Sequence, residues 1–98
     1  MLTSKQRANL RGCANKIDTI LQVGKGGIGD TLIKQIDDAL VAREIIKIKV
    51  LENCEYTSRE VAQILSEKTN SEPVQVIGNK VVLFKRNPKA PKFDNYLK

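Results

Sequence analysis

The sequence contains no histidine and no tryptophan among its 98 residues, and only four aromatic side chains. Without histidine, the chain lacks the commonest general base and the commonest metal ligand. The two cysteines, Cys13 and Cys54, are too far apart for a C-x-x-C motif or a zinc-binding spacing. Asp37 and Asp38 are neighbours that point to different faces of a helix, so they form no acid–base pair. These absences disfavour an enzyme, a metal site, a cofactor and a small-molecule substrate.

Long apolar runs are also missing, and none approaches the length that crosses a bilayer. The N-terminal residues lack the apolar segment of a secretory signal, so we expect a cytoplasmic protein without a membrane partner. A chain of 98 residues suits one small domain with a modest core. We expect this monomeric domain over residues 1–86 and a flexible basic tail, rich in proline and lysine, over residues 87–98.

Positive charge is what the sequence has in excess, with a formal net charge of +6. Residues 1–25 carry five lysines and arginines against one acid, and residues 80–98 carry six against one. The middle of the chain, residues 26–79, carries six against nine. Such an uneven distribution is typical of a protein that binds a polyanion, although a basic surface can also serve solubility alone. Charge therefore favours nucleic acid as the partner.

Apolar periodicity predicts the element order α-β-α-β-α-β-β. Helices are expected from a Thr3 cap to about residue 17, from 29 or 30 to 43, and from 57 or 58 to 68. Strands are expected over 20–23, 45–51, 74–77 and 81–84. Lys47 and Lys49 alternate with apolar residues, so one side of that strand should face water. The predicted fold is an α+β two-layer sandwich, in which helices cover one face of a four-stranded mixed sheet that ends in a hairpin.

A glycine-rich stretch, Gly24-Lys25-Gly26-Gly27-Ile28-Gly29, joins the first expected strand to the second expected helix. Its bare backbone can approach a phosphate that a Cβ would keep away. It matches both the G-x-G-x-x-G of dinucleotide-binding folds and the G-x-x-G clamp of KH-type RNA-binding domains, and glycines of this kind can also serve only as a turn. Three features disfavour a nicotinamide- or flavin-binding domain: the chain is short, the strand over 45–51 has one side that faces water, and the positive charge lies near the two ends of the sequence.

The loop supplies the expected RNA contacts. We expect the N–H groups of Gly26, Gly27 and Ile28 to bind phosphates, in a loop that begins at Gly24 and carries the charge of Lys25. Basic residues outside the loop extend the expected RNA-binding surface: Lys5, Arg7, Arg11, Lys47 and Lys49. Because aromatics are few and no RNP-type motif is present, backbone recognition with strong salt dependence is expected.

Two other functions stay open from the residues alone. The acidic side of the second expected helix, around Asp37 and Asp38, could bind a protein of the translation machinery, although a solvated helix face has the same composition. The G-x-G-x-x-G match leaves nucleotide binding as a further alternative.

Residues 2 to about 86 resemble the CRM domain (chloroplast RNA splicing and ribosome maturation) in its stand-alone bacterial, YhbY-type form. The matching stretches are Leu2-Thr3-Ser4-Lys5-Gln6 with Leu10-Arg11, Gln22-Val23-Gly24-Lys25-Gly26-Gly27, Glu44-Ile45-Ile46-Lys47-Ile48-Lys49-Val50, and Val74-Gln75-Val76-Ile77-Gly78 with Leu83-Phe84-Lys85. Ser4, Ile45 and Phe84 depart from the Gly, Leu and Tyr that are usual in the family. The resemblance implies a fold like the C-terminal domain of bacterial translation initiation factor three. It also implies RNA binding without catalysis, with ribosomal RNA of large-subunit precursors as the partner.

Overall fold

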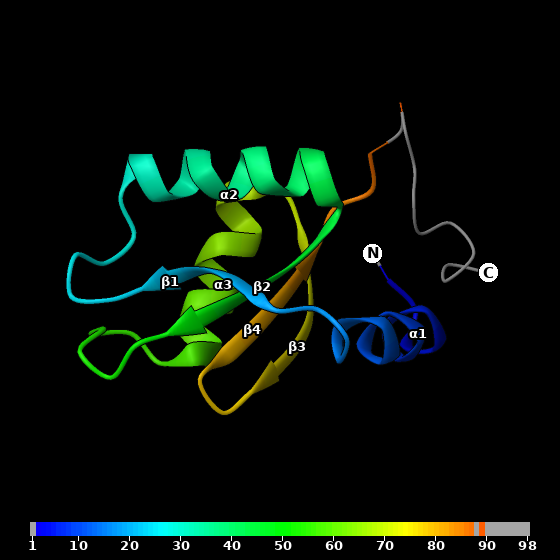
Figure 1. Cartoon of the computed structure of the whole chain (residues 1–98), viewed down its shortest axis with the longest axis horizontal. Coiled ribbons are helices and arrows are strands. Elements are labelled where there is room, and N and C mark those ends of the chain that lie inside the picture. The colour runs from blue at the N-terminus through cyan, green and yellow to red at the C-terminus, as the bar shows by residue number, and fades with distance from the viewer. Residues whose placement is uncertain (1, 88, 90–98) are drawn as a thin grey trace.

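The computed structural model describes residues 2–87 and 89. Its elements follow the order expected from periodicity (Figure 1). The helices are α1 (Ser4–Ala14), α2 (Asp30–Arg43) and α3 (Ser58–Thr69), and the strands are β1 (Thr19–Val23), β2 (Ile45–Val50), β3 (Glu72–Ile77) and β4 (Lys80–Phe84). The strands form one mixed sheet in the spatial order β1-β2-β4-β3, in which β1 and β2 are parallel and β4 is antiparallel to both β2 and β3.

Two of the helices begin at a capping box. The Thr3 hydroxyl accepts a hydrogen bond from the Gln6 N–H at 3.1 Å, and the Gln6 side chain accepts one from the Thr3 N–H at 2.9 Å. Thr57 and Glu60 repeat this arrangement at the start of α3, at 3.2 and 2.9 Å. Each box pairs backbone donors that a helix start would otherwise leave free. By contrast, the N-cap residue of α2 is Gly29, which provides no side-chain cap.

One face of the sheet is covered by α2 and α3, and the main hydrophobic core lies between this face and the two helices. The strands contribute alternating apolar residues, and each helix contributes one apolar stripe. The buried residues of this core are Val23, Ile36, Leu40, Ile46, Ile48, Val50, Val61, Ala62, Leu65, Val81 and Leu83.

The opposite face of the sheet is only partly covered, by α1. The buried residues of this second, smaller core are Leu10, Ala14, Ile45, Val74, Val82 and Phe84. The fold class is confirmed, but the prediction that helices cover one face only is wrong for α1. The physical reason is that Ile45 and Phe84 make one end of this face apolar, so that it needs a cover, whereas Lys47 and Lys49 keep the other end open to water.

Beyond β4 the chain runs along the end of α2. The Lys85 N–H donates to the Glu44 carbonyl at 2.8 Å, and the Asn87 side chain donates to the Val41 carbonyl at 3.2 Å. The expected tail over residues 87–98 lies outside the described residues, apart from Asn87 and Lys89. Within the described part of the chain, no helix is long and apolar enough to cross a membrane.

Candidate nucleic-acid interface

The glycine loop, residues 24–29, connects β1 to α2 (Figure 1). It opens with a tight turn in which the Gly27 N–H donates to the Gly24 carbonyl at 3.0 Å. Gly27 has a φ of +71°, in the left-handed region where a Cβ is strained. Lys25 and Gly26 form the tip of this turn, and both are exposed. The loop therefore presents to solvent a bare backbone next to one lysine.

One side of the glycine loop is packed and the other is open. A Cβ on Gly24 would lie 3.1 Å from Leu51 Cδ1 and 3.2 Å from Asn53 Oδ1. The Leu51 N–H also donates to the last carbonyl of β1 at 2.8 Å, which holds the neighbouring loop in place. A Cβ on Gly26 or Gly29 would meet no atom within 4 Å. A ligand can therefore approach the backbone at Gly26 and Gly29, whereas the backbone at Gly24 lies close against Leu51 and Asn53.

The start of α2 adds unpaired backbone donors directly behind the loop. Its N-cap residue, Gly29, is extended, with φ −105° and ψ 176°, and carries no side-chain acceptor. The first amides of a helix have no intrahelical acceptor, and the helix dipole adds partial positive charge there. Among the described residues, the N–H groups of Gly26 and Ile28 have no hydrogen-bond partner either. Several free donors within a few residues suit an anion such as phosphate.

The structure separates the roles of the expected donors. The Gly27 N–H is engaged in the turn, so this amide is not free for phosphate as the sequence suggested. The Ile28 side chain packs against the main core, which anchors the loop at that residue. Asp30 is exposed in the first turn of α2, where its charge favours the helix start and opposes an anion placed beside it. The open approach to the loop is therefore at its tip, on the Gly26 side.

The basic residues of α1 lie far from the loop. Lys5, Arg7 and Arg11 are on a helix at the other end of the molecule's long axis (Figure 1). The Arg7 Nε donates to the Pro73 carbonyl at 3.2 Å, so this guanidinium helps to hold α1 against β3. The fold does not bring these three residues to the glycine loop.

The lysines of β2 lie on the uncovered part of the sheet. Lys47 and Lys49 are half-buried and point away from the main core. Lys80 lies directly opposite Lys49 across the β2–β4 ladder. The sequence analysis did not single out Lys80, because its position opposite Lys49 depends on the register between β2 and β4, which no local turn sets.

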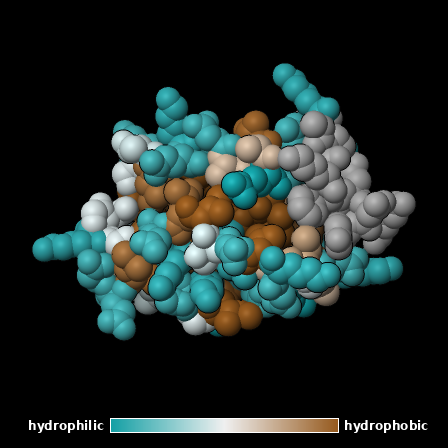
Figure 2. Space-filling view, in the orientation of Figure 1, coloured by the Kyte–Doolittle hydropathy of each residue, from teal (hydrophilic) through white to brown (hydrophobic). Residues whose placement is uncertain are grey.

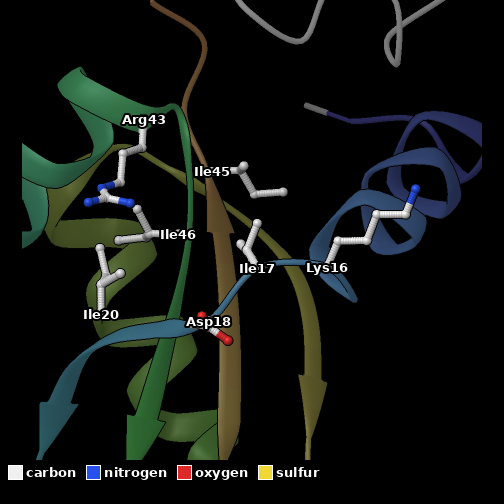
Figure 3. Close-up of a pocket in the computed structure, with 7 residues that line it drawn as sticks. All are labelled: Lys16, Ile17, Asp18, Ile20, Arg43, Ile45 and Ile46. Atoms are coloured by element: carbon white, nitrogen blue, oxygen red, sulfur yellow. The ribbon is translucent and has the colours of Figure 1, made fainter.

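A hollow of about 540 Å³ lies between the end of α1, the start of β1 and the end of α2 (Figure 3). Its lining residues are Lys16, Ile17, Asp18, Ile20, Arg43, Ile45 and Ile46. Figure 2 shows apolar side chains gathered in the middle of this view, with hydrophilic ones around them. Four of the lining residues are isoleucines, and Asp18 is the one carboxylate among them, so the lining contains no acid–base pair of carboxylates. Nowhere in residues 2–87 and 89 do three or more His, Cys, Asp or Glu residues gather as metal ligands would.

Neither alternative function gains support from the geometry. A dinucleotide-binding fold needs two βαβ halves on a parallel sheet, and the described strands provide one parallel pair, β1 and β2. On α2, Asp37 is half-buried and Asp38 is exposed, as on an ordinary solvated helix face.

The fold and the loop together define a small, basic α+β module with an amide-rich glycine loop at a strand-to-helix junction. The family model of the CRS1/YhbY (CRM) domain matches residues 2–85. This chain therefore belongs to the CRS1/YhbY (CRM) domain family.

Relatives of known sequence or structure are similar over almost the whole chain. The protein named "Probable RNA-binding protein YqeI" from Bacillus subtilis is 51% identical over 87 residues, which cover 89% of this chain and 91% of that protein. An RNA-binding protein from Haemophilus influenzae is 28% identical over 89 residues, which cover 91% and 90%. The solution structure of the hypothetical protein SAV1595 from Staphylococcus aureus has a TM-score of 0.76 and 52% identity, covering 89% of this chain and 91% of that one.

Proposed function

We propose that this protein binds RNA through its glycine loop, and that its partner is ribosomal RNA of large-subunit precursors in the cytoplasm. The observation that carries the proposal is the exposed turn at Lys25 and Gly26, whose free backbone donors lie next to an uncapped helix start. The names of the Bacillus and Haemophilus relatives favour RNA over other polyanions. The ribosomal partner follows from the resemblance to the stand-alone YhbY-type domain.

In this mechanism the loop residues act together, but only some of them donate hydrogen bonds. A phosphate at the tip accepts from the Gly26 and Ile28 N–H groups, and the Lys25 ammonium lies alongside as a mobile positive charge. Gly27 contributes through its backbone, because its N–H closes the turn onto Gly24 and its positive φ sets the direction of the chain that follows. Gly24 contributes by allowing close packing against the loop after β2.

The described aromatic residues support backbone recognition over base reading. Phe84 is 3% exposed and belongs to the core beneath α1. Tyr56 is half-buried against the main core. The Phe84 ring is not free to stack on a base, and core contacts take up part of the Tyr56 ring, whereas RNA-binding modules with aromatic platforms present exposed rings. Phosphate contacts should therefore dominate the affinity, which should fall steeply as salt is raised.

The decisive variant is Gly26→Asp, measured with fragments of bacterial large-subunit ribosomal RNA across a salt series. The new side chain has open space and an ordinary backbone conformation, so the fold should be kept. Its carboxylate would stand where the phosphate binds. We expect the affinity to fall roughly tenfold or more, and the dependence of affinity on salt to become shallower.

The matched control is Gln63→Glu, which changes the net charge by the same amount on the exposed side of α3. This variant should bind RNA nearly as well as the wild type. Equal losses in the two variants would show that overall charge, rather than the loop, determines binding. That result, or a wild-type protein that does not bind the RNA fragments, would overturn the proposal.

A further inference from the structure

The uncovered part of the sheet, named here the open sheet face, consists of two rows of side chains set by the cross-strand registers. The row nearer the glycine loop contains Gln22, Lys49, Lys80 and Ile77. The next row contains Lys47, Val82 and Gln75; Val82 is buried in the core beneath α1, so this row forms the border of the open sheet face. Side chains in register on neighbouring strands share one face, so these residues lie together. The two rows hold three lysines and no acidic residue.

A shallow groove runs over this face. It has a volume of about 150 Å³ and is lined by Asn15, Lys47, Gln75, Ile77, Lys80 and Val82. Two of the lysines therefore border the same space, together with amide and apolar groups. Asn15 is the C-cap of α1, so the groove reaches from the β3–β4 hairpin to the end of that helix.

The pairing of Lys49 with Lys80 is unfavourable for the free protein. Residues directly opposite each other in an antiparallel ladder have Cβ atoms about 5 Å apart, and like charges at such positions destabilise a sheet. Among the described residues, neither ammonium group has a hydrogen-bond or ion-pair partner. Sheet stability therefore gives no reason for lysine at both positions. A bound polyanion would attract both ammonium groups and so offset the repulsion between them.

We propose that the open sheet face is a second RNA-contacting surface, on which phosphates bind Lys47, Lys49 and Lys80. This inference rests on the proposed function, and Lys80 is the contact residue that it adds. The row of Lys49 begins at Gln22, two positions before the glycine loop, so an RNA strand held by the loop can continue across the sheet.

The same path connects the loop with the distant basic helix. Along β2, Lys47 and Lys49 are about 7 Å apart, so successive phosphates can meet successive lysines. The groove then ends at Asn15, whose N–H donates to the Arg11 carbonyl at 3.2 Å. Residues four apart on a helix lie on the same side, so Arg11 continues the basic path beyond the sheet.

The test compares Lys80→Gln with Lys34→Gln, which removes the same charge from an exposed position on α2, the helix that covers the other face. Without the like-charge pair, Lys80→Gln should raise the Tm by roughly 2–5 °C. The same variant should bind large-subunit ribosomal RNA fragments roughly threefold to tenfold more weakly. Its log–log salt slope should fall by about 0.7, as expected for one lost phosphate contact on a single strand. Lys34→Gln should leave the affinity and the slope near wild type.

A gain in stability together with a loss of binding is the signature of a lysine placed for RNA, and Lys80→Arg, which keeps the charge, should retain binding. If Lys80→Gln binds as the wild type does while Gly26→Asp does not, the open sheet face is not a contact surface and the loop proposal stands. If Lys80→Gln loses affinity and also melts at a lower temperature, the loss comes from the fold, and the inference fails. A wild-type protein without RNA affinity overturns the proposed function itself.

Discussion

Two adjacent glycines at the tip of the loop have different conformational requirements. Gly27 has a φ of +71°, whereas Gly26 has an ordinary φ and open space around its Cβ position. Alanine in the left-handed region costs about 1–2 kcal/mol. We therefore expect Gly27→Ala to be less stable than Gly26→Ala by about that amount in urea denaturation. If the two variants unfold at the same urea concentration, the turn does not have the geometry described.

Residue roles within the loop could be predicted only in part from the sequence. The glycine spacing located the turn between β1 and α2, because glycine is the residue that tolerates both a positive φ and close packing. It could not show that Gly27 closes the turn while Gly24 packs against a neighbouring loop, since both roles depend on tertiary contacts. The proposed contact at Lys80 could not be predicted for a related reason: its position opposite Lys49 appears only when β2 and β4 are aligned.

At the scale of elements, the uncapped start of α2 allows the proposed RNA binding and the stability of the fold to be tested separately. Gly29 already has the extended backbone of an N-cap, and nothing lies within 4 Å of its Cβ position. In Gly29→Ser the hydroxyl would accept from a first-turn N–H, which stabilises the helix by a few tenths of a kcal/mol relative to glycine. The same hydroxyl would compete with a phosphate for that donor. We expect RNA affinity to fall roughly threefold to tenfold while the free energy of unfolding stays level or rises.

The control at the same position is Gly29→Ala. Alanine is a poor N-cap, so this variant should lose about 1 kcal/mol of stability, but it brings no competing oxygen and should keep more of the RNA affinity. Calorimetric melting and RNA titration of both variants measure the two effects separately. Serine and alanine variants that bind RNA equally well would exclude the start of α2 from the phosphate site.

The elements themselves could largely be predicted, because their signals are local. The capping boxes at Thr3 and Thr57, the alternation along β2 and the hairpin turn each act within a few residues. The face of the sheet that α1 covers could not be predicted in this way. Periodicity shows which side of a helix is apolar. It does not show which face of the sheet that side packs against, because this depends on where apolar residues of the sheet remain exposed.

At the scale of the whole molecule, the two hydrophobic cores stabilise different parts of the fold. The main core joins the glycine loop to α2 and α3, since Ile28 packs against it, whereas the core beneath α1 is smaller and lies on the other face. The loop and the helices that hold it can therefore persist when α1 is loosened. The basic residues of α1 therefore do not position the loop.

Leu10→Ala tests this separation, because Leu10 is fully buried in the core beneath α1. Truncating a buried leucine costs about 2–5 kcal/mol, and here the loss should fall first on the contact between α1 and the sheet. Amide hydrogen exchange should show α1 opening at a lower free energy than the β2 and β4 strands. Leu65→Ala, in the main core, should instead lower the protection of α1 and of these strands together, because α3 packs on β3 and β4, and β3 also carries α1 while β4 pairs with β2. If Leu10→Ala destabilises every element equally, the two cores unfold as one cooperative unit, and α1 is as much a part of the loop's scaffold as α3.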